Sequence, residues 1–418
     1  MSNIGYSIGR TERGQSTWQF LLGELKPKGK IFTPFNIISV PVILVGLVLI
    51  VIRFAKGIGS VTNLSQEVPW GLWIGFDVVA GVAFAGGAYV ITFMVYILNL
   101  KKYESIVRVT VLNGFLAYLF YAGALLLDLG RPWNVINPII GNGFGVSSVL
   151  FLVAWHFLLY MIAELIEFSP AIAEWIGARR AVKILSGMTL AAVIFGITLS
   201  TLHQSGLGAL FLMASEKIHP LWYSEFIPIL FFVSSIFAGL SMVIFEGSIS
   251  QKVFYDQISE KNRIAHEDIL ISLSRICAIT LFVYFFLQVL VLIHGKHIDL
   301  LNTPMGYWYL TELLGFVLLP MILFFLAYRR QNELLIKVAA IMTILGVLLN
   351  RLNVTVIGFK WDSASHYYPS WMEIMVSLTV LFIEIWIFRW IVNRLPVLRQ
   401  GMYGLSRVLK QWIQVCSL

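Results

Sequence analysis

Long apolar runs separated by short polar segments fill the chain between residues 35 and 393. A helix needs about 20 consecutive apolar residues to cross the hydrocarbon core of a bilayer. Ten runs reach this length, so the pattern predicts an all-α protein with ten transmembrane helices. The predicted spans are 35–56, 70–99, 107–128, 146–168, 185–213, 225–250, 268–293, 306–328, 334–357 and 370–393.

Two polar segments flank this membrane domain. Residues 1–34 contain no apolar core near the start, so they are not expected to be a cleavable signal peptide. In residues 394–418, apolar positions recur at helical spacing beside Arg407 and Lys410. This predicts an amphipathic helix on the membrane surface, with a partner-binding role as the alternative.

Lys and Arg residues are distributed unevenly over the predicted loops. Of the 30, 22 fall in the two terminal segments and in alternate loops, whereas the other loops hold six. Basic loops remain in the cytoplasm. The sequence therefore predicts a bacterial inner-membrane protein with both termini in the cytoplasm and an even number of spans.

Composition agrees with this interpretation. Apolar residues form 58% of the chain and charged residues 12%, compared with roughly 25% charged in soluble domains. The two cysteines, Cys277 and Cys416, are too few for a disulfide framework, a cysteine-ligated zinc site or an iron–sulfur cluster. The net charge of +8 belongs mainly to the expected cytoplasmic segments, so it does not indicate a nucleic-acid partner.

Three ionisable residues lie in the outer halves of separate spans. They are Asp77, Asp128 and His203. A carboxylate in lipid costs a few kcal/mol, so Asp77 must face protein, water or a ligand. Because an imidazole and two carboxylates can accept protons during a redox reaction, we expect one shared polar pocket.

Structural alternatives exist for two of these residues. His203 could pack between helices with its ring bonded to a backbone carbonyl. Asp128 could form an ion pair with Arg131 at the membrane surface.

Other polar residues lie deeper or nearer the cytoplasmic face. Glu246, Glu164, His156 and Tyr89 could form part of a proton route from the cytoplasm. Polar pairing between helices is the alternative for each.

No haem and no metal are expected in this chain. Two bis-histidine b-haems need four histidines on facing helices at matched depths. Only His156 and His203 lie well inside the spans, and their depths differ. No phosphate-binding loop follows a strand, so no nucleotide site is predicted.

Short motifs in one register over residues 35–395 resemble the NrfD/PsrC family of membrane subunits of quinone-linked oxidoreductases. Within the family, the chain is most similar to the HybB-type subunits of periplasmic nickel–iron hydrogenases. The motifs are Gly59–Val61, Pro69–Asp77, Asp128–Arg131, Trp133–Asn134, Ser147–Phe151, Thr201–Ser205, His219–Trp222, Ile244–Ser248, Arg351–Leu352 and Tyr368–Glu373.

The resemblance implies two four-helix bundles, spans two to five and six to nine, with flanking helices. It also implies a menaquinone or ubiquinone site near the periplasmic face, without a redox metal in this subunit. The partners would be a periplasmic ferredoxin-like iron–sulfur subunit and an upstream catalytic or cytochrome subunit. The quinone site carries over to His203, Asp77 and Asp128, with Trp73, Gln204 and Arg131 as neighbours.

An ion-coupled secondary transporter is the alternative function, with Asp77, Glu246 and Arg351 as ion or substrate ligands. Such sites usually lie at the bilayer midplane on broken helices, whereas the polar cluster here lies toward one face. A membrane anchor without a site of its own is a third class. A faint repeat is also visible, because Trp70 to Gly87 and Trp222 to Gly239 have the same spacing.

Overall fold

The computed structural model describes residues 22–28, 31–66, 68–140, 148–258, 260–363 and 366–398. Over this part of the chain the structure is helical, and its one strand-like feature is an isolated bridge between Ile218 and Phe359. Ten helical stretches are long and apolar enough to cross a membrane, which confirms the predicted fold class. They are Pro34–Lys56, Trp73–Ile97, Lys101–Asp128, Val149–Trp175, Arg179–Leu212, Ile227–Val253, Arg263–His294, Pro304–Arg330, Glu333–Ile357 and Trp371–Val392.

The observed helices extend beyond the predicted spans mainly where polar residues continue the helix. The fourth ends at Trp175 and the fifth begins at Arg179, so a short turn joins them. Hydropathy detects only the part that suits hydrocarbon, whereas an α-helix continues into the interface. The amphipathic helix predicted for residues 394–418 lies almost entirely outside the described residues.

Several spans are composed of more than one helical type. The second span begins and ends with π-helical turns, which are rare and often occur at functional sites. The eighth and ninth spans also contain π-helical segments. The elements of the spans are α2 (Pro34–Lys56); η3 (Trp73–Ala80), α3 (Gly81–Ala85), α4 (Gly87–Thr92) and η4 (Phe93–Ile97); α5 (Glu104–Asp128); α7 (Val149–Trp175); α8 (Arg179–Leu212); α9 (Ile227–Val253); α10 (Glu260–His294); α11 (Pro304–Leu310), η10 (Thr311–Leu318) and α12 (Leu319–Arg330); α13 (Glu333–Leu352) and η11 (Asn353–Ile357); and α14 (Trp371–Val392).

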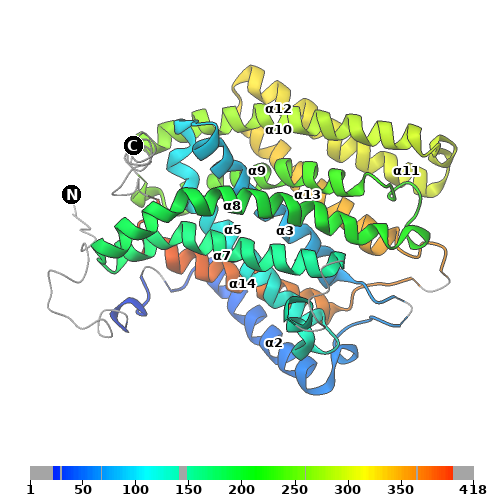
Figure 1. Ribbon diagram of the computed structural model, residues 1–418, viewed down its shortest axis with the longest axis horizontal. Coiled ribbons are helices and arrows are strands. Elements are labelled where there is room, and N and C mark those ends of the chain that lie inside the picture. The colour runs from blue at the N-terminus through cyan, green and yellow to red at the C-terminus, as the bar shows by residue number, and fades with distance from the viewer. Residues whose placement is uncertain are drawn as a thin grey trace.

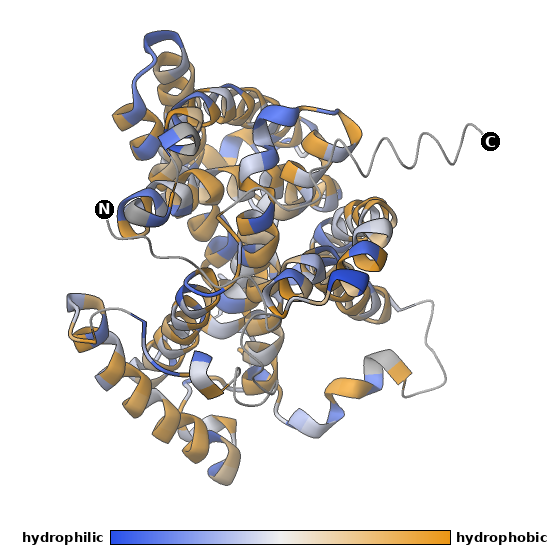
Figure 2. Cartoon of the chain, turned by 90° about the vertical axis from the view of Figure 1, so that its left-hand side faces the viewer, coloured by the Kyte–Doolittle hydropathy of each residue, from blue (hydrophilic) through white to orange (hydrophobic). Residues whose placement is uncertain are grey.

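The helices form two bundles of four, as expected. The first bundle combines the second span with α5, α7 and α8, and the second combines α9, α10, α12 and α13. The helix α2 packs against α14 at the side of the first bundle (Figure 1). Hydrophobic residues dominate the helices (Figure 2), and many large apolar side chains on their outer faces are exposed. A membrane-spanning protein requires such an apolar outer surface.

Glycines allow the two bundles to cross closely. A Cβ atom placed on Gly239 of α9 would lie 2.0 Å from the backbone nitrogen of Gly87 in α4. Any larger residue at this crossing would force the two helices apart. Gly87 and Gly239 occupy equivalent positions in the faint repeat, and they lie in contact in the structure.

The two ends of the molecule differ. We call the end with the turns 98–103, 176–178 and 331–332 the basic end, because Lys101, Lys102, Arg179, Arg180, Arg329 and Arg330 lie in or beside these turns. The other, formed by 57–66, 68–72, 129–140, 213–226, 295–303, 358–363 and 366–370, is the long-loop end.

Candidate functional site

Asp77 lies on η3 and faces the last helix of the chain. Its side chain is buried, and its Oδ2 accepts a hydrogen bond of 2.8 Å from the hydroxyl of Ser377 on α14. Asp77 therefore has a protein partner inside the membrane, as the cost of an isolated carboxylate demands.

Trp73 anchors the beginning of η3 to the beginning of α14. Its indole Nε1 donates to the backbone oxygen of Glu373 at 3.1 Å. The Glu373 carboxylate accepts from the Tyr367 hydroxyl and from the backbone nitrogen of Ser370, both at 2.6 Å. Burial and the hydrogen bond to Glu373 raise the pKa of Tyr367, so its hydroxyl remains a donor. We call Asp77, Ser377, Trp73, Glu373 and Tyr367 the α14 cluster.

Asp128, at the end of α5, lies next to Arg53 rather than Arg131. The buried Arg53 guanidinium donates to the backbone oxygens of Leu127, at 2.7 Å, and Leu129. A cation suits these carbonyl groups, which the end of a helix leaves without partners. Arg131 is exposed and forms no ion pair with Asp128, so this sequence-based alternative is not observed.

His203 lies on α8 inside the first bundle. Its Nδ1 is 3.2 Å from the backbone oxygen of Val153 on α7, and its ring packs against Tyr118 and Phe157. A carbonyl can only accept, so Nδ1 carries the proton and Nε2 holds a lone pair in the neutral ring. This Nε2 is buried and has no hydrogen-bond partner among the described residues.

Several polar atoms near His203 also lack partners. Gln204 is an exception, because its amide nitrogen donates to the backbone oxygen of Val82 at 2.8 Å and ties α8 to α3. The buried atoms without a partner of good hydrogen-bond geometry are the Tyr118 hydroxyl, the Ser200 hydroxyl and both carboxyl oxygens of Glu164, although Tyr118 lies beside Ser200 and Glu164 lies beside Tyr160. We call His203, Tyr118, Ser200 and Glu164 the first-bundle cluster.

The structure does not bring Asp77 and His203 together. Asp77 bonds to Ser377 on α14, whereas the ring of His203 contacts α7 and α5. Two separate clusters therefore replace the single pocket expected from the sequence. The sequence places a residue at a depth but does not define which face of its helix meets which neighbour.

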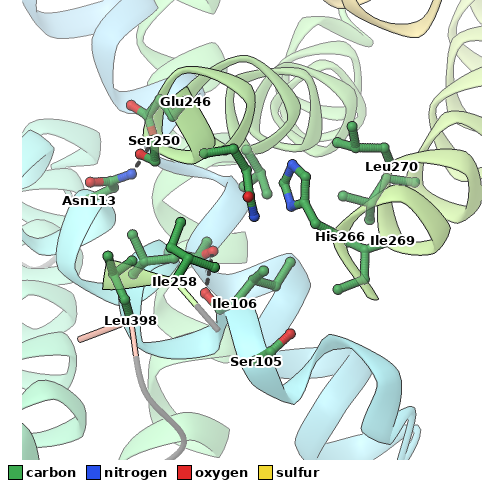
Figure 3. A pocket seen from close by; sticks show the side chains of 16 residues that line it. Ser105, Ile106, Asn113, Glu246, Ser250, Ile258, His266, Ile269, Leu270 and Leu398 are labelled. Atoms are coloured by element: carbon green, nitrogen blue, oxygen red, sulfur yellow. Dashed lines mark hydrogen bonds between the residues drawn. The ribbon is translucent and has the colours of Figure 1, made fainter. Parts of the chain in front are cut away.

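Polar residues nearer the basic end lie apart from one another. Glu246 accepts from the amide of Asn113, beside a small cavity of about 60 Å³ that His266 lines from the other side (Figure 3). Tyr89 bonds to Ser235 at 2.9 Å. No hydrogen-bonded chain links these residues to Glu164 or His156 within the described part of the protein.

The second bundle contains a buried polar network of its own. The Glu312 carboxylate on η10 accepts from Trp222 at 2.7 Å, from Asn350 at 2.7 Å and from Asn353 at 2.5 Å. Arg351 donates to Asn350 and to Ser234, and its guanidinium lies 3.7 Å above the Phe231 ring. We call Glu312, Trp222, Asn350, Asn353 and Arg351 the second-bundle network.

Sequence reasoning missed several of these residues. Among them, Glu373 had a readable signal, because Ser370-x-x-Glu373 before an apolar run is a capping-box pattern, and the structure forms that box. Arg53 was assigned to a loop because it lies at the end of a span. Ser377 and Glu312 carry no distinguishing pattern, since a single polar residue in an apolar run does not reveal its partner.

Comparison with known proteins identifies the family. A family model described as polysulphide reductase, NrfD, matches residues 60–361. The chain belongs to the NrfD family. This confirms the resemblance inferred from the motifs.

Three relatives extend over most of the chain. A protein of Nitratidesulfovibrio vulgaris is 41% identical over 88% of this chain and 95% of its own length. The probable Ni/Fe-hydrogenase 2 b-type cytochrome subunit of Escherichia coli is 30% identical over 88% of this chain and 94% of its own. The integral membrane subunit of a menaquinone reductase, also from Nitratidesulfovibrio vulgaris, is 29% identical over 78% and 82%. This NrfD-family chain is thus similar to membrane subunits of redox complexes.

The description of the Escherichia coli relative as a b-type cytochrome disagrees with our expectation that no haem is bound. The described residues of this NrfD-family chain do not fit a haem. The ring of His203 packs against Tyr118 and Phe157, with centroids 5.6 and 5.4 Å away, and its Nδ1 is already bound to the Val153 carbonyl. A cavity of about 380 Å³ between the bundles has no histidine in its lining. Within the described residues, no group of three His, Cys, Asp or Glu side chains could hold a metal ion.

Proposed function

We propose that this NrfD-family protein is the membrane subunit through which a respiratory oxidoreductase complex exchanges electrons with the quinone pool. A ferredoxin-like iron–sulfur subunit would bind at the long-loop end, and an upstream catalytic or cytochrome subunit would complete the complex. The menaquinone reductase and hydrogenase relatives support this proposal. The basic end would face the cytoplasm of a bacterial inner membrane.

The unpaired Nε2 of His203 carries the proposal. Buried polar atoms in native proteins are almost always hydrogen-bonded, so an orphaned acceptor requires an explanation. A quinone takes up two electrons and two protons when it is reduced to a quinol. Its oxygen atoms suit the first-bundle cluster, because a quinol hydroxyl can donate to Nε2 and a quinone carbonyl can accept from the Tyr118 or Ser200 hydroxyl.

In this proposal, His203 accepts or returns a proton at one defined atom, its Nε2. The carbonyl of Val153 holds the proton on Nδ1, so Nε2 is the basic atom that accepts or returns a proton. Asp77 and Asp128 are the other proposed proton-handling groups, and Trp73, through Glu373, positions the helix that carries Asp77. Gln204 fixes the helix that carries His203, and Arg131 remains a proposed neighbour.

Protons could reach the site from the basic end. Glu246, Glu164, His156 and Tyr89 are the proposed route, and Glu246 lies beside the cavity that His266 also lines. If these protons come from the cytoplasm, turnover would contribute to a membrane potential. A steady-state proton-to-electron ratio measured in proteoliposomes tests this part of the proposal.

The transporter alternative is less well supported. It needs Arg351 as a ligand, but Arg351 is occupied by Asn350, Ser234 and the face of Phe231. No observation in the described residues favours a substrate at that position.

Replacement of His203 by Ala tests the proposed function in the purified complex. We expect quinone-linked turnover to fall by about 100-fold or more, as for loss of a proton-transferring group, while an artificial acceptor is still reduced. Thr198→Ala is the matched control, because Thr198 lies on the exposed face of the same helix and bonds only to its own backbone at Ile194. Unchanged quinone kinetics in His203→Ala would contradict the proposal.

A further inference from the structure

A chamber lies between the two bundles, apart from the first-bundle cluster. Its volume is about 380 Å³, within the roughly 300–1,000 Å³ range of small-molecule sites. Side chains from α5, α9, α13, α14 and the second span form its walls. Most of them are apolar, among them Phe84, Leu116, Phe245, Leu348, Leu381 and Phe388.

Two polar groups in the chamber wall have no hydrogen-bond partner. Tyr121 and Glu384 both line the chamber, and neither forms a hydrogen bond with another described residue. In contrast, Glu246 in the same wall accepts from Asn113. The carboxyl group of Glu384 lies within electrostatic range of the Tyr121 phenol. Together they form a polar end in an otherwise apolar space.

The tyrosine has a defined position. A Cβ atom on Gly81 would lie 2.3 Å from Cζ of Tyr121, so this glycine accommodates the ring. The close contact limits the movement of the ring and keeps its hydroxyl at the chamber.

The chamber can be reached from the lipid. The helices α13 and α14 both contribute side chains to its wall. However, α14 packs mainly against α2 and α5 and has little contact with α13. Leu348 of α13 and Leu381 of α14 line the chamber and are also partly exposed, so this is the side from which a lipid-soluble molecule would enter.

We propose that this chamber binds the ring of a membrane quinone at a second site, with the prenyl tail leaving between α13 and α14. Tyr121 and the neutral form of Glu384, which an apolar surrounding favours, would donate to the ring oxygens. Water alone would fill the chamber poorly, because its apolar walls offer few hydrogen-bond partners. A phospholipid acyl chain would leave both polar groups unpaired, at a cost of about 1–3 kcal/mol each. This second site rests on the proposed function only for the class of its ligand, a quinone.

The test measures bound quinone per chain in the complex, extracted and quantified by mass spectrometry. Leu381→Trp places a larger ring in the chamber and narrows it, and Ile387→Trp on the exposed side of the same helix is the matched control. We expect Leu381→Trp to lose about one quinone per chain relative to Ile387→Trp. The double variant Tyr121→Phe, Glu384→Leu, which removes both donors, should bind added quinone about tenfold more weakly, as expected for two lost hydrogen bonds.

The measured quinone content decides whether the second site exists. Equal quinone content in Leu381→Trp and Ile387→Trp, or phospholipid released in place of quinone, would overturn the second site. The assay needs no turnover, so it is independent of the proposed function. If that function fails, His203→Ala and the wild type will show the same quinone-linked rate, whatever the chamber binds.

Discussion

The two four-helix bundles differ in how completely the buried polar groups at their centres are hydrogen-bonded. In the second bundle, Glu312 receives three hydrogen bonds, and Arg351 is held by Asn350, Ser234 and Phe231. In the first bundle, acceptors and hydroxyls of comparable burial have no partner, and His203 Nε2 is among them. A satisfied network stabilises a fold, whereas an unsatisfied one leaves capacity for a ligand or a proton.

The second bundle is not perfectly satisfied. Arg351 Nε and the Ser241 hydroxyl also lack partners. The difference between the two bundles therefore concerns the buried carboxylates. The Glu312 carboxylate accepts three hydrogen bonds, whereas the oxygens of Glu164 accept none of good geometry, although Tyr160 lies beside them. Variants that damage one bundle and spare the other can test this contrast.

Glu312→Ala should have the largest effect on stability. The change leaves the donors of Trp222, Asn350 and Asn353 unpaired and removes a carboxylate near Arg351. Breaking such a buried charged network costs about 3–5 kcal/mol. Thermal unfolding of the purified protein measures this loss. Glu312→Gln, which keeps one acceptor oxygen, should lose less, and equal melting temperatures for the two variants would contradict this role.

Gly239→Ala should separate the bundles. The added methyl group would lie 2.0 Å from the Gly87 nitrogen, and overpacking of this kind costs about 1–3 kcal/mol. Gly196→Ala is the control, since its nearest neighbour would lie 3.6 Å away, an ordinary contact. The melting temperature should fall for Gly239→Ala only. A wild-type value would show that the crossing can relax.

Trp73→Phe should loosen the connection between η3 and α14. The variant retains an aromatic ring but loses the donor to the Glu373 carbonyl, worth about 1 kcal/mol. Hydrogen exchange at the beginning of α14 should become faster. Unchanged exchange there would mean that Tyr367 and the capping box suffice to hold the two elements.

His219 should produce a pH dependence at the long-loop end. Burial and the nearby His297 lower the pKa of His219, and its Nδ1 accepts from the Leu221 backbone nitrogen at 3.2 Å. The folded state therefore favours the neutral ring. Its stability is complete above the ordinary imidazole pKa of about 6.5 and is lost as the pH falls below that value. After correction for the intrinsic pH dependence of amide exchange, the protection of residues 215–226 should decrease from pH 7.5 to pH 5.5, and less so in His219→Asn.

The sequence predicted the fold well because hydrocarbon imposes a simple rule on length and polarity. All ten spans and the burial of Asp77 were anticipated from the residues, whereas the two bundles were implied by the family resemblance. The partners were not anticipated, because Ser377 lies 300 residues away on α14 and helical periodicity does not specify which helices meet. The catalytic roles of His203, Asp77 and Asp128 remain predictions.

The most direct test of the contrast compares His203→Ala with Glu312→Gln in the same complex. Melting temperature and quinone-linked turnover are measured for both variants. The account predicts that His203→Ala loses turnover at a nearly unchanged melting temperature, while Glu312→Gln melts earlier but turns over quinone while folded. If His203→Ala instead unfolds early and Glu312→Gln abolishes quinone turnover in the folded protein, the roles assigned to the two bundles are wrong.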